Sequence, residues 1–133
     1  MQPGDTCETR GVVTGADTAA SIGSGGLPVL GTPRMIAMME NAAYSLLQRE
    51  LPESKTSVGT RLDVSHLSPS PVGMNVRAEA TVTSVSDDGR TVEFSVSAWD
   101  DAGLIGKGFH RRVILDVSRF LEKSERKLKD KEN

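Results

Sequence analysis

Three polar side chains in this sequence have the types and the places to do chemistry. Thr32 opens the segment at residues 31–51, which is typical of a helix, and Glu40 lies within the apolar stripe of that segment. His66 lies at the end of an alternating segment at residues 57–67. A helix start offers free N–H groups and a positive dipole end, which can hold an oxygen that gains negative charge. A carboxylate can act as a nucleophile or a base, and an imidazole can transfer protons.

Each of these residues also has a purely structural interpretation. The Thr32 hydroxyl suits an N-cap, because it can accept from a backbone N–H that has no partner within the helix. A carboxylate without water or a partner costs several kcal/mol or takes up a proton, so Glu40 has a partner, faces a pocket, or lies at the rim of the stripe. A single histidine on an apolar face, such as His66, is more often a satisfied core residue than a catalyst. The residues alone leave these alternatives open.

The segment at residues 31–51 has clear helix limits. Pro33 falls at the first helical position, where its missing N–H costs nothing, and Pro52 cannot continue the helix. At about 1.5 Å per residue the helix would be roughly 28 Å long. A helix that is apolar nearly all round is a buried helix. The apolar residues fill two adjacent faces: Ile36, Met39, Ala43, Tyr44 and Leu47 on one, and Met35, Met38, Ala42 and Leu46 on the other.

Alternation of apolar and polar residues indicates strands in the rest of the chain. The alternation is clear at residues 57–67, 74–86, 91–100 and 104–117, and weak at residues 8–14. In the first of these segments, one face is expected to carry Val58, Thr60, Leu62, Val64 and His66. Ala78, Ala80 and Ala98 are small, which leaves room for a helix against the sheet.

The connecting segments carry turn residues. Asp88-Gly89 predicts a tight hairpin, and the Ser-Pro-Ser-Pro run at residues 68–71 ends a strand sharply. Residues 1–7 are expected to be loosely held. Residues 16–30 are expected to form a loop whose glycines lack the Lys and Ser/Thr of a phosphate-binding loop. Residues 118–133 predict a charged helix that docks through Phe120, Leu121 and Leu128.

Composition limits the class of protein. With 133 residues we expect a single domain spanning 1–133, with its core at about residues 8–120. The net charge of −2 gives no basic footprint for nucleic acid, and no apolar run reaches the roughly 20 residues of a membrane span. The single cysteine, Cys7, cannot form an internal disulfide or an all-cysteine metal site, and we expect no metal site. Without a signal-peptide pattern at the N-terminus, we expect a cytoplasmic protein.

These elements predict an α+β domain in which antiparallel strands form a meander of hairpins around one long helix. The helix is too apolar to be covered by one sheet alone. A second copy of the chain is the natural cover, so we expect a homodimer, with a tetramer of such pairs as the alternative.

The arrangement resembles the hotdog fold, in which a five-stranded antiparallel sheet wraps around one long buried helix. The resemblance spans about residues 8–120 and is closest to the fluoroacetyl-CoA thioesterase-like branch of hotdog proteins. It rests on the spacing of Gly31-Thr32, Glu40, Gly59-Thr60 and His66, on Pro69 and Pro71, on Val72-Gly73, and on Gly106 and Gly108.

The resemblance implies a catalytic set of Thr32, Glu40 and His66, with Gly31, Gly59 and Thr60 approaching the acyl group. Arg112 would meet the phosphates of CoA; Arg34, Lys107 and Arg111 are alternatives. His110 is expected to be structural or exposed. Members selective for fluoroacetyl groups carry aromatic residues in the loop before the Thr, whereas residues 22–26 here read Ile-Gly-Ser-Gly-Gly.

The implied function is hydrolysis of the thioester of a short or small substituted acyl-CoA, with no metal or redox cofactor. CoA is then part of the substrate. Two alternatives remain: a non-catalytic module that binds acyl-CoA or another small ligand, and a hotdog hydratase or dehydratase acting on acyl thioesters.

Overall fold

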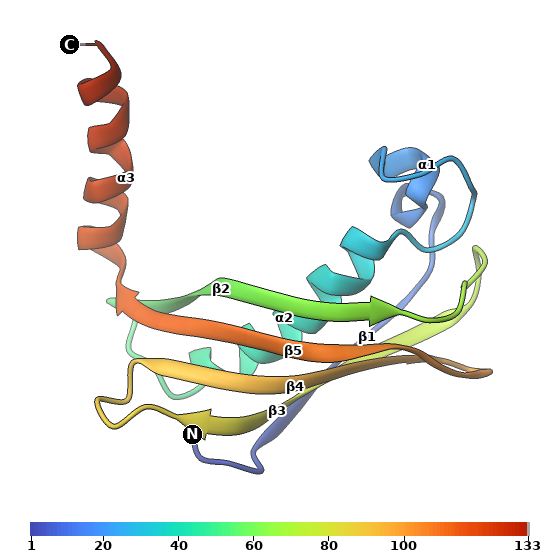
Figure 1. Cartoon of the computed structure of the whole chain (residues 1–133), viewed down its shortest axis with the longest axis horizontal. Coiled ribbons are helices and arrows are strands. Elements are labelled where there is room, and N and C mark those ends of the chain that lie inside the picture. The colour runs from blue at the N-terminus through green and yellow to red at the C-terminus, as the bar shows by residue number, and fades with distance from the viewer. Residues whose placement is uncertain (133) are drawn as a thin grey trace.

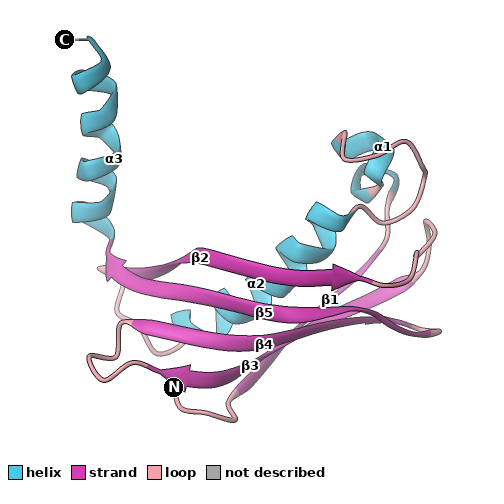
Figure 2. Cartoon of the chain, in the orientation of Figure 1, coloured by secondary structure: helices cyan, strands magenta, loops and turns pink. Residues whose placement is uncertain are grey.

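A computed structural model describes residues 1–132; Asn133 lies outside the described residues. One antiparallel sheet, in the order β1-β3-β4-β5-β2, lies against a long helix, α2, that crosses one of its faces (Figures 1 and 2). The architecture is α+β, as predicted. The strands are β1 (Thr6–Val12), β2 (Lys55–His66), β3 (Asn75–Val85), β4 (Thr91–Asp100) and β5 (Gly103–Asp116). The helices are α1 (Ala19–Ile22), α2 (Thr32–Gln48) and α3 (Val117–Glu132), preceded by a 3₁₀ turn, η1 (Gly15–Asp17).

The start of α2 corrects one detail of the sequence interpretation. Gly31, in an extended conformation, occupies the N-cap position, so Thr32 is the first helical residue and Pro33 the second. The Thr32 hydroxyl is therefore not used as a cap and is available to another partner. The expected loop at residues 16–30 also contains the short helix α1, which Thr18 caps by accepting from the Ser21 N–H.

The strand order corrects the predicted meander. Only β3, β4 and β5 follow one another as neighbours, whereas β2 pairs with β5 and β3 pairs with β1. The Ser-Pro-Ser-Pro run after β2 cannot form a two-residue turn, and the chain crosses to the other side of the sheet before β3 begins. As a result β2 is an edge strand, and no described strand pairs with its outer side.

The core lies between α2 and the inner face of the sheet. Met35, Met39, Ala42, Ala43 and Leu47 on the helix are fully buried, and so are Ala78 and Ala80 on β3. The predicted space over the small residues of the sheet is therefore confirmed. Gly106 lies under the helix at a point where an added Cβ would be 2.5 Å from Met35 Sδ, so only a glycine lets α2 approach β5 so closely.

A β-bulge at Thr60 changes the faces of β2. Gly59 pairs with Arg112 and Arg61 pairs with Arg111, which leaves Thr60 as the extra residue. Leu62, Val64 and His66 lie on the inner face, as expected, but before the bulge the inner residues are Ser57 and Gly59 rather than Val58 and Thr60. The bulge thus brings Gly59 beside Arg112 under the helix.

Both ends of the chain differ from expectation. The N-terminal ammonium pairs with Glu50, and β1 begins at Thr6, so residues 1–7 are not loosely held. At the other end, α3 stands away from the sheet (Figure 1). The predicted docking of α3 is wrong, because its large apolar residues are exposed: Phe120 by 41%, Leu121 by 53% and Leu128 by 68%. Within residues 1–132, no helix is both long enough and apolar enough to cross a membrane.

Candidate active site

Thr32 and His66 meet where the start of α2 passes the end of β2. Thr32 Oγ1 lies 2.8 Å from His66 Nδ1, so the hydroxyl donates to the ring when the ring proton is on Nε2. The sequence left open whether His66 pairs with Thr32 or Glu40, and the structure gives Thr32. This pair lines a groove of about 360 Å³ between the loop before α2 and the segment after β2.

The other nitrogen of His66 has no partner. Its Nε2 is buried and makes no hydrogen bond to any described residue. Burial lowers the pKa of His66 below its usual 6.5. The nearby Ser68 backbone raises this pKa by a smaller amount, although it forms no hydrogen bond of normal geometry with the ring. A neutral imidazole that accepts from a hydroxyl is suited to remove a proton from it or to exchange protons with a bound substrate.

Glu40 has the partner that its place in the apolar stripe required. Its Oε2 lies 3.6 Å from Arg112 Nη1; the Glu40 side chain is 37% exposed and that of Arg112 only 7%. The carboxylate is therefore held by a buried cation while one side of it remains accessible. That arrangement keeps the carboxylate oriented and open to a substrate.

Arg112 is in turn held by the inner face of β2. Its Nε donates to Ser57 Oγ at 2.8 Å and its Nη2 to Ser57 O at 3.0 Å, while its guanidinium lies 5.9 Å from the centre of the Tyr44 ring. Burial lowers the pKa of Arg112, and the neighbouring Glu40 opposes that change. Because these donors are directed at protein groups in the interior, the placement argues against the predicted contact of Arg112 with the phosphates of CoA.

His110 completes this buried cluster, although the sequence interpretation assigned it no part in the site. Its Nδ1 lies 2.8 Å from Arg61 O, and a carbonyl only accepts, so Nδ1 carries the proton. Nε2 can then accept from Arg112 Nη1 at 3.1 Å. Burial is the largest cause that lowers the pKa of His110, and the Arg112 charge adds to it. A sequence signal existed, because His110 and Arg112 are two apart on one strand and so share a face.

Gly59 is the backbone contact of the carboxylate. A Cβ added there would lie 2.9 Å from Glu40 Oε2 and 3.0 Å from His110 Cε1, so a side chain at Gly59 would displace one of them. Gly59 thus lies close to the carboxylate, and its approach to the acyl group stays a prediction. Thr60, in the bulge, makes only a long contact of 3.4 Å from its hydroxyl to Arg111 O, and Gly31 is the N-cap of α2.

Within one chain the three predicted catalytic residues form two centres rather than one. Thr32 and Glu40 are eight residues apart on α2, which corresponds to about 12 Å along the helix axis. Among the described residues, no hydrogen bond or ion pair joins Glu40 to Thr32 or His66. The pair at the helix start and the carboxylate two turns on are thus separately organised.

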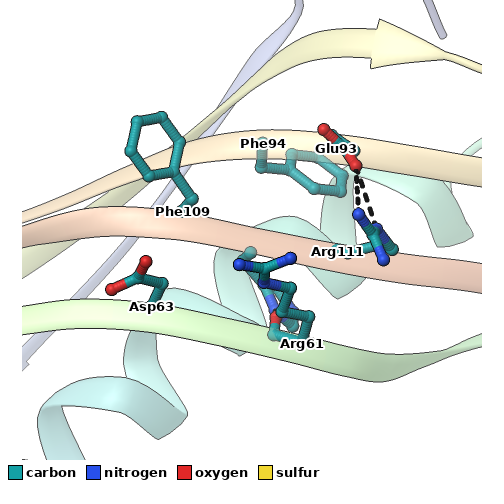
Figure 3. Close-up of a pocket in the computed structure, with 7 residues that line it drawn as sticks. Arg61, Asp63, Glu93, Phe94, Phe109 and Arg111 are labelled. Atoms are coloured by element: carbon teal, nitrogen blue, oxygen red, sulfur yellow. Dashed lines mark hydrogen bonds and ion pairs between the residues drawn. The ribbon is translucent and has the colours of Figure 1, made fainter.

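Two of the other cations proposed for CoA are paired with carboxylates. Arg34 pairs with Asp17 at 3.0 Å, and Arg111 pairs with Glu93 at 2.8 Å. Arg111 and Arg61 line a smaller hollow of about 170 Å³ beside Phe109, on the side of the sheet opposite α2 (Figure 3). Within residues 1–132, no group of three or more His, Cys, Asp or Glu side chains is placed to hold a metal ion.

Comparison with solved structures defines the class. The chain aligns with the fluoroacetyl-CoA thioesterase at a TM-score of 0.89 and 28% identity, covering 96% of this chain and 97% of that one. It aligns with a thioesterase superfamily member of Thermus thermophilus at a TM-score of 0.85 and 30% identity, over 97% and 93% of the two chains. A hot-dog-like protein of Thermanaerovibrio acidaminovorans gives 0.83 and 26%, over 94% and 91%. The protein is therefore a hotdog-fold protein.

The family follows from the sequence comparisons. The family model described as fluoroacetyl-CoA-specific thioesterase matches residues 13–118, and the chain belongs to this family. The fluoroacetyl-CoA thioesterase of Streptantibioticus cattleyicolor is 32% identical over 99 residues, which are 74% of this chain and 70% of that protein.

Proposed function

We propose that this protein hydrolyses the thioester of a short or small substituted acyl-CoA, which yields the free acid and CoA. The observation that carries the proposal is the hydrogen bond between Thr32 and His66 at the start of a helix, in a chain that belongs to a thioesterase family. Without the family match, the same hydrogen bond at a helix start would not indicate a function.

The helix start can stabilise the reacting carbonyl. At the start of α2, Pro33 has no N–H and the Arg34 N–H donates to Gly31 O at 3.0 Å, so the Thr32 N–H is the backbone donor left for a thioester oxygen that gains negative charge. The Thr32 hydroxyl donates to His66 Nδ1, and the neutral His66 can take up a proton released during the reaction and pass it to the sulfur as the C–S bond breaks. The acyl carbon takes an oxygen from water, and the thiolate leaves as the thiol of CoA.

Glu40 either attacks the acyl carbon directly or removes a proton from the attacking water. In the first route an anhydride forms and water then cleaves it; in the second, water attacks in one step. The contact with Arg112 and the tight space at Gly59 support either route, because both fix the position of the carboxylate.

We also propose that the working form is a homodimer. The edge strand β2 has no described partner on its outer side, and Tyr44 on α2 and Leu62 on β2 are 38% and 39% exposed beside it. The roughly 12 Å between Thr32 and Glu40 within one chain supports a site that a second copy completes. In sedimentation equilibrium we expect twice the chain mass of 14.2 kDa, and half of the protein or more as monomer for Leu62→Glu. A wild-type monomer would refute the dimer, and four chains would indicate a tetramer.

The proposed chemistry uses only groups of the protein and water. We therefore expect turnover to be unchanged after treatment with EDTA and dialysis, and to need no redox cofactor. No role for nucleic acid or a membrane is proposed. A cytoplasmic location remains a prediction, to be checked by fractionation.

The decisive experiment measures thiol release from a panel of acyl-CoAs by the wild-type protein and its variants. We expect Glu40→Gln and His66→Ala to lose about 100-fold or more in kcat/KM while remaining folded. Glu53→Gln is the matched control, because it makes the same chemical change at an exposed residue outside the site. Full activity in Glu40→Gln would show that this carboxylate has no chemical role.

The groove beside Thr32 and His66 also favours a second candidate, a module that binds acyl-CoA without hydrolysing it. Binding of CoA esters with no thiol release from any of them would favour that alternative. Formation or loss of an α,β double bond in the acyl group would instead indicate a hydratase or dehydratase.

A further inference from the structure

The groove beside the Thr32–His66 pair has two walls of different origin. The loop before α2 forms one wall with residues 24–30, and the segment that follows β2 forms the other with residues 67–69. Thr32 and His66 also line the groove, so a molecule bound there would lie next to the proposed reacting atoms. The volume, about 360 Å³, equals roughly twelve water molecules at about 30 Å³ each.

The lining of this groove is mainly aliphatic, and its polar side chains are those of Ser24, Ser68 and the Thr32–His66 pair. Apart from His66, whose pKa is lowered by burial, no charged side chain lines it among the described residues, and no Phe, Tyr or Trp does so. Two leucines, Leu27 on one wall and Leu67 on the other, are 67% and 54% exposed. The aliphatic lining residues are Ala19, Leu27, Val29, Leu30, Leu67 and Pro69.

We infer that this groove binds the acyl chain of the substrate, and that the preferred acyl group is neutral, aliphatic and longer than acetyl. This inference rests on the proposed function and specifies its substrate. An acetyl group would leave most of the groove in water, whereas a chain of about four to eight carbons would fill roughly a third to two thirds of it. Each methylene that leaves water adds favourable transfer free energy, whereas a terminal carboxylate would be desolvated without a cation to meet it.

Gly26 gives a direct way to close the groove. An added Cβ there would have no heavy atom within 4 Å, and its φ is not in the left-handed region, so Gly26→Phe introduces a large ring without backbone strain. Gly15→Phe is the matched control, because Gly15 has the same open surroundings and does not line the groove.

The test compares kcat/KM for acetyl-, butanoyl-, hexanoyl-, octanoyl- and succinyl-CoA. For the wild-type protein and Gly15→Phe we expect a rise of about two- to fourfold per added methylene up to hexanoyl. We expect succinyl-CoA to be at least tenfold poorer than butanoyl-CoA. Gly26→Phe should lose the rise with length, so that kcat/KM for hexanoyl-CoA falls to about that for acetyl-CoA.

A second measurement separates the groove from the chemistry. Binding of the non-hydrolysable thioethers ethyl-CoA and hexyl-CoA is measured by calorimetry on the same three proteins. Turnover with a flat length profile, or with acetyl-CoA as the best substrate, would overturn the groove assignment and leave the proposed function intact. A third outcome is that no ester is hydrolysed, while hexyl-CoA binds more tightly than ethyl-CoA to the wild-type protein and Gly15→Phe but not to Gly26→Phe. In that case the groove assignment holds and the proposed function fails. No turnover and equal binding would overturn both.

Discussion

Replacing Gly59 by Ala tests whether the position of the Glu40 carboxylate matters for turnover. The new Cβ would lie 2.9 Å from Glu40 Oε2, whereas ordinary contact begins at about 3.4 Å, so the carboxylate must move by roughly 0.5 Å. It can do so, because Oε2 is the far end of a flexible side chain that is 37% exposed. His110 Cε1, at 3.0 Å, belongs to a buried ring and has less freedom to move.

The expected effects on stability and on rate therefore differ. A shift of a flexible side chain and a slight adjustment of His110 should cost about 1 kcal/mol of the free energy of unfolding, or a fall of about 3–5 °C in Tm. A displacement of 1 Å in a catalytic group can cost about 100-fold in rate, so roughly 0.5 Å should lower kcat by about 10- to 100-fold. We expect KM to change by less than threefold.

The assay is thiol release from the best acyl-CoA at saturating concentration, with Tm measured on the same samples. Gly11→Ala is the matched control: its added Cβ would meet Met38 Cε at 3.9 Å, an ordinary contact on the same helix, and we expect unchanged kcat. If Gly59→Ala is folded and retains kcat within twofold, the reasoning that Glu40 must be held in place is refuted.

Three further predictions follow from the site. Thr32→Val removes the donor to His66 and should lower kcat/KM by about 100- to 1000-fold, whereas Thr32→Ser should retain at least a tenth of it. Because the pKa of His66 is lowered, the acidic limb of the kcat/KM profile should have its midpoint below pH 6.5; a midpoint above pH 7 would contradict a neutral His66 base. Arg112→Met should lower the free energy of unfolding in urea by about 2–3 kcal/mol, because Ser57 loses two hydrogen bonds from the guanidinium. Glu40 also loses its ion pair, but its partial exposure limits that cost. A loss below about 0.5 kcal/mol would contradict the buried network.

Local patterns were enough to locate the main elements of the fold. The helix predicted at residues 31–51 forms at Thr32–Gln48, and the strand predicted at residues 91–100 forms at Thr91–Asp100. The hydrogen bonds of a helix, and the side-chain alternation of a strand with one buried face, depend on residues close in the sequence, so both leave a readable period. The connection after β2 left no comparable signal, because which strand becomes a neighbour depends on how the whole sheet packs under α2.

The candidate site shows the same division. Glu40 and His66 stood out because each places a polar group in an apolar pattern, whereas Thr32 stood out as a helix cap, and only the family resemblance joined the three into one set. The role of Arg112 was not, since its partners Ser57 and Glu40 are 55 and 72 positions away in the sequence and meet it only through the pairing of β2 with β5 and the crossing of α2.

Sequence alone determined the long buried helix, the five strands and the polar residues that interrupt their apolar faces, because these features follow from the chemistry of neighbouring residues. Tertiary structure decided that Thr32 pairs with His66, that the bulge at Thr60 turns Gly59 inward, and that Arg112 holds Glu40 from the interior. These contacts join segments far apart in the chain, and their geometry is fixed by strand register and by the angle at which α2 crosses the sheet. No local pattern of residues encodes either quantity.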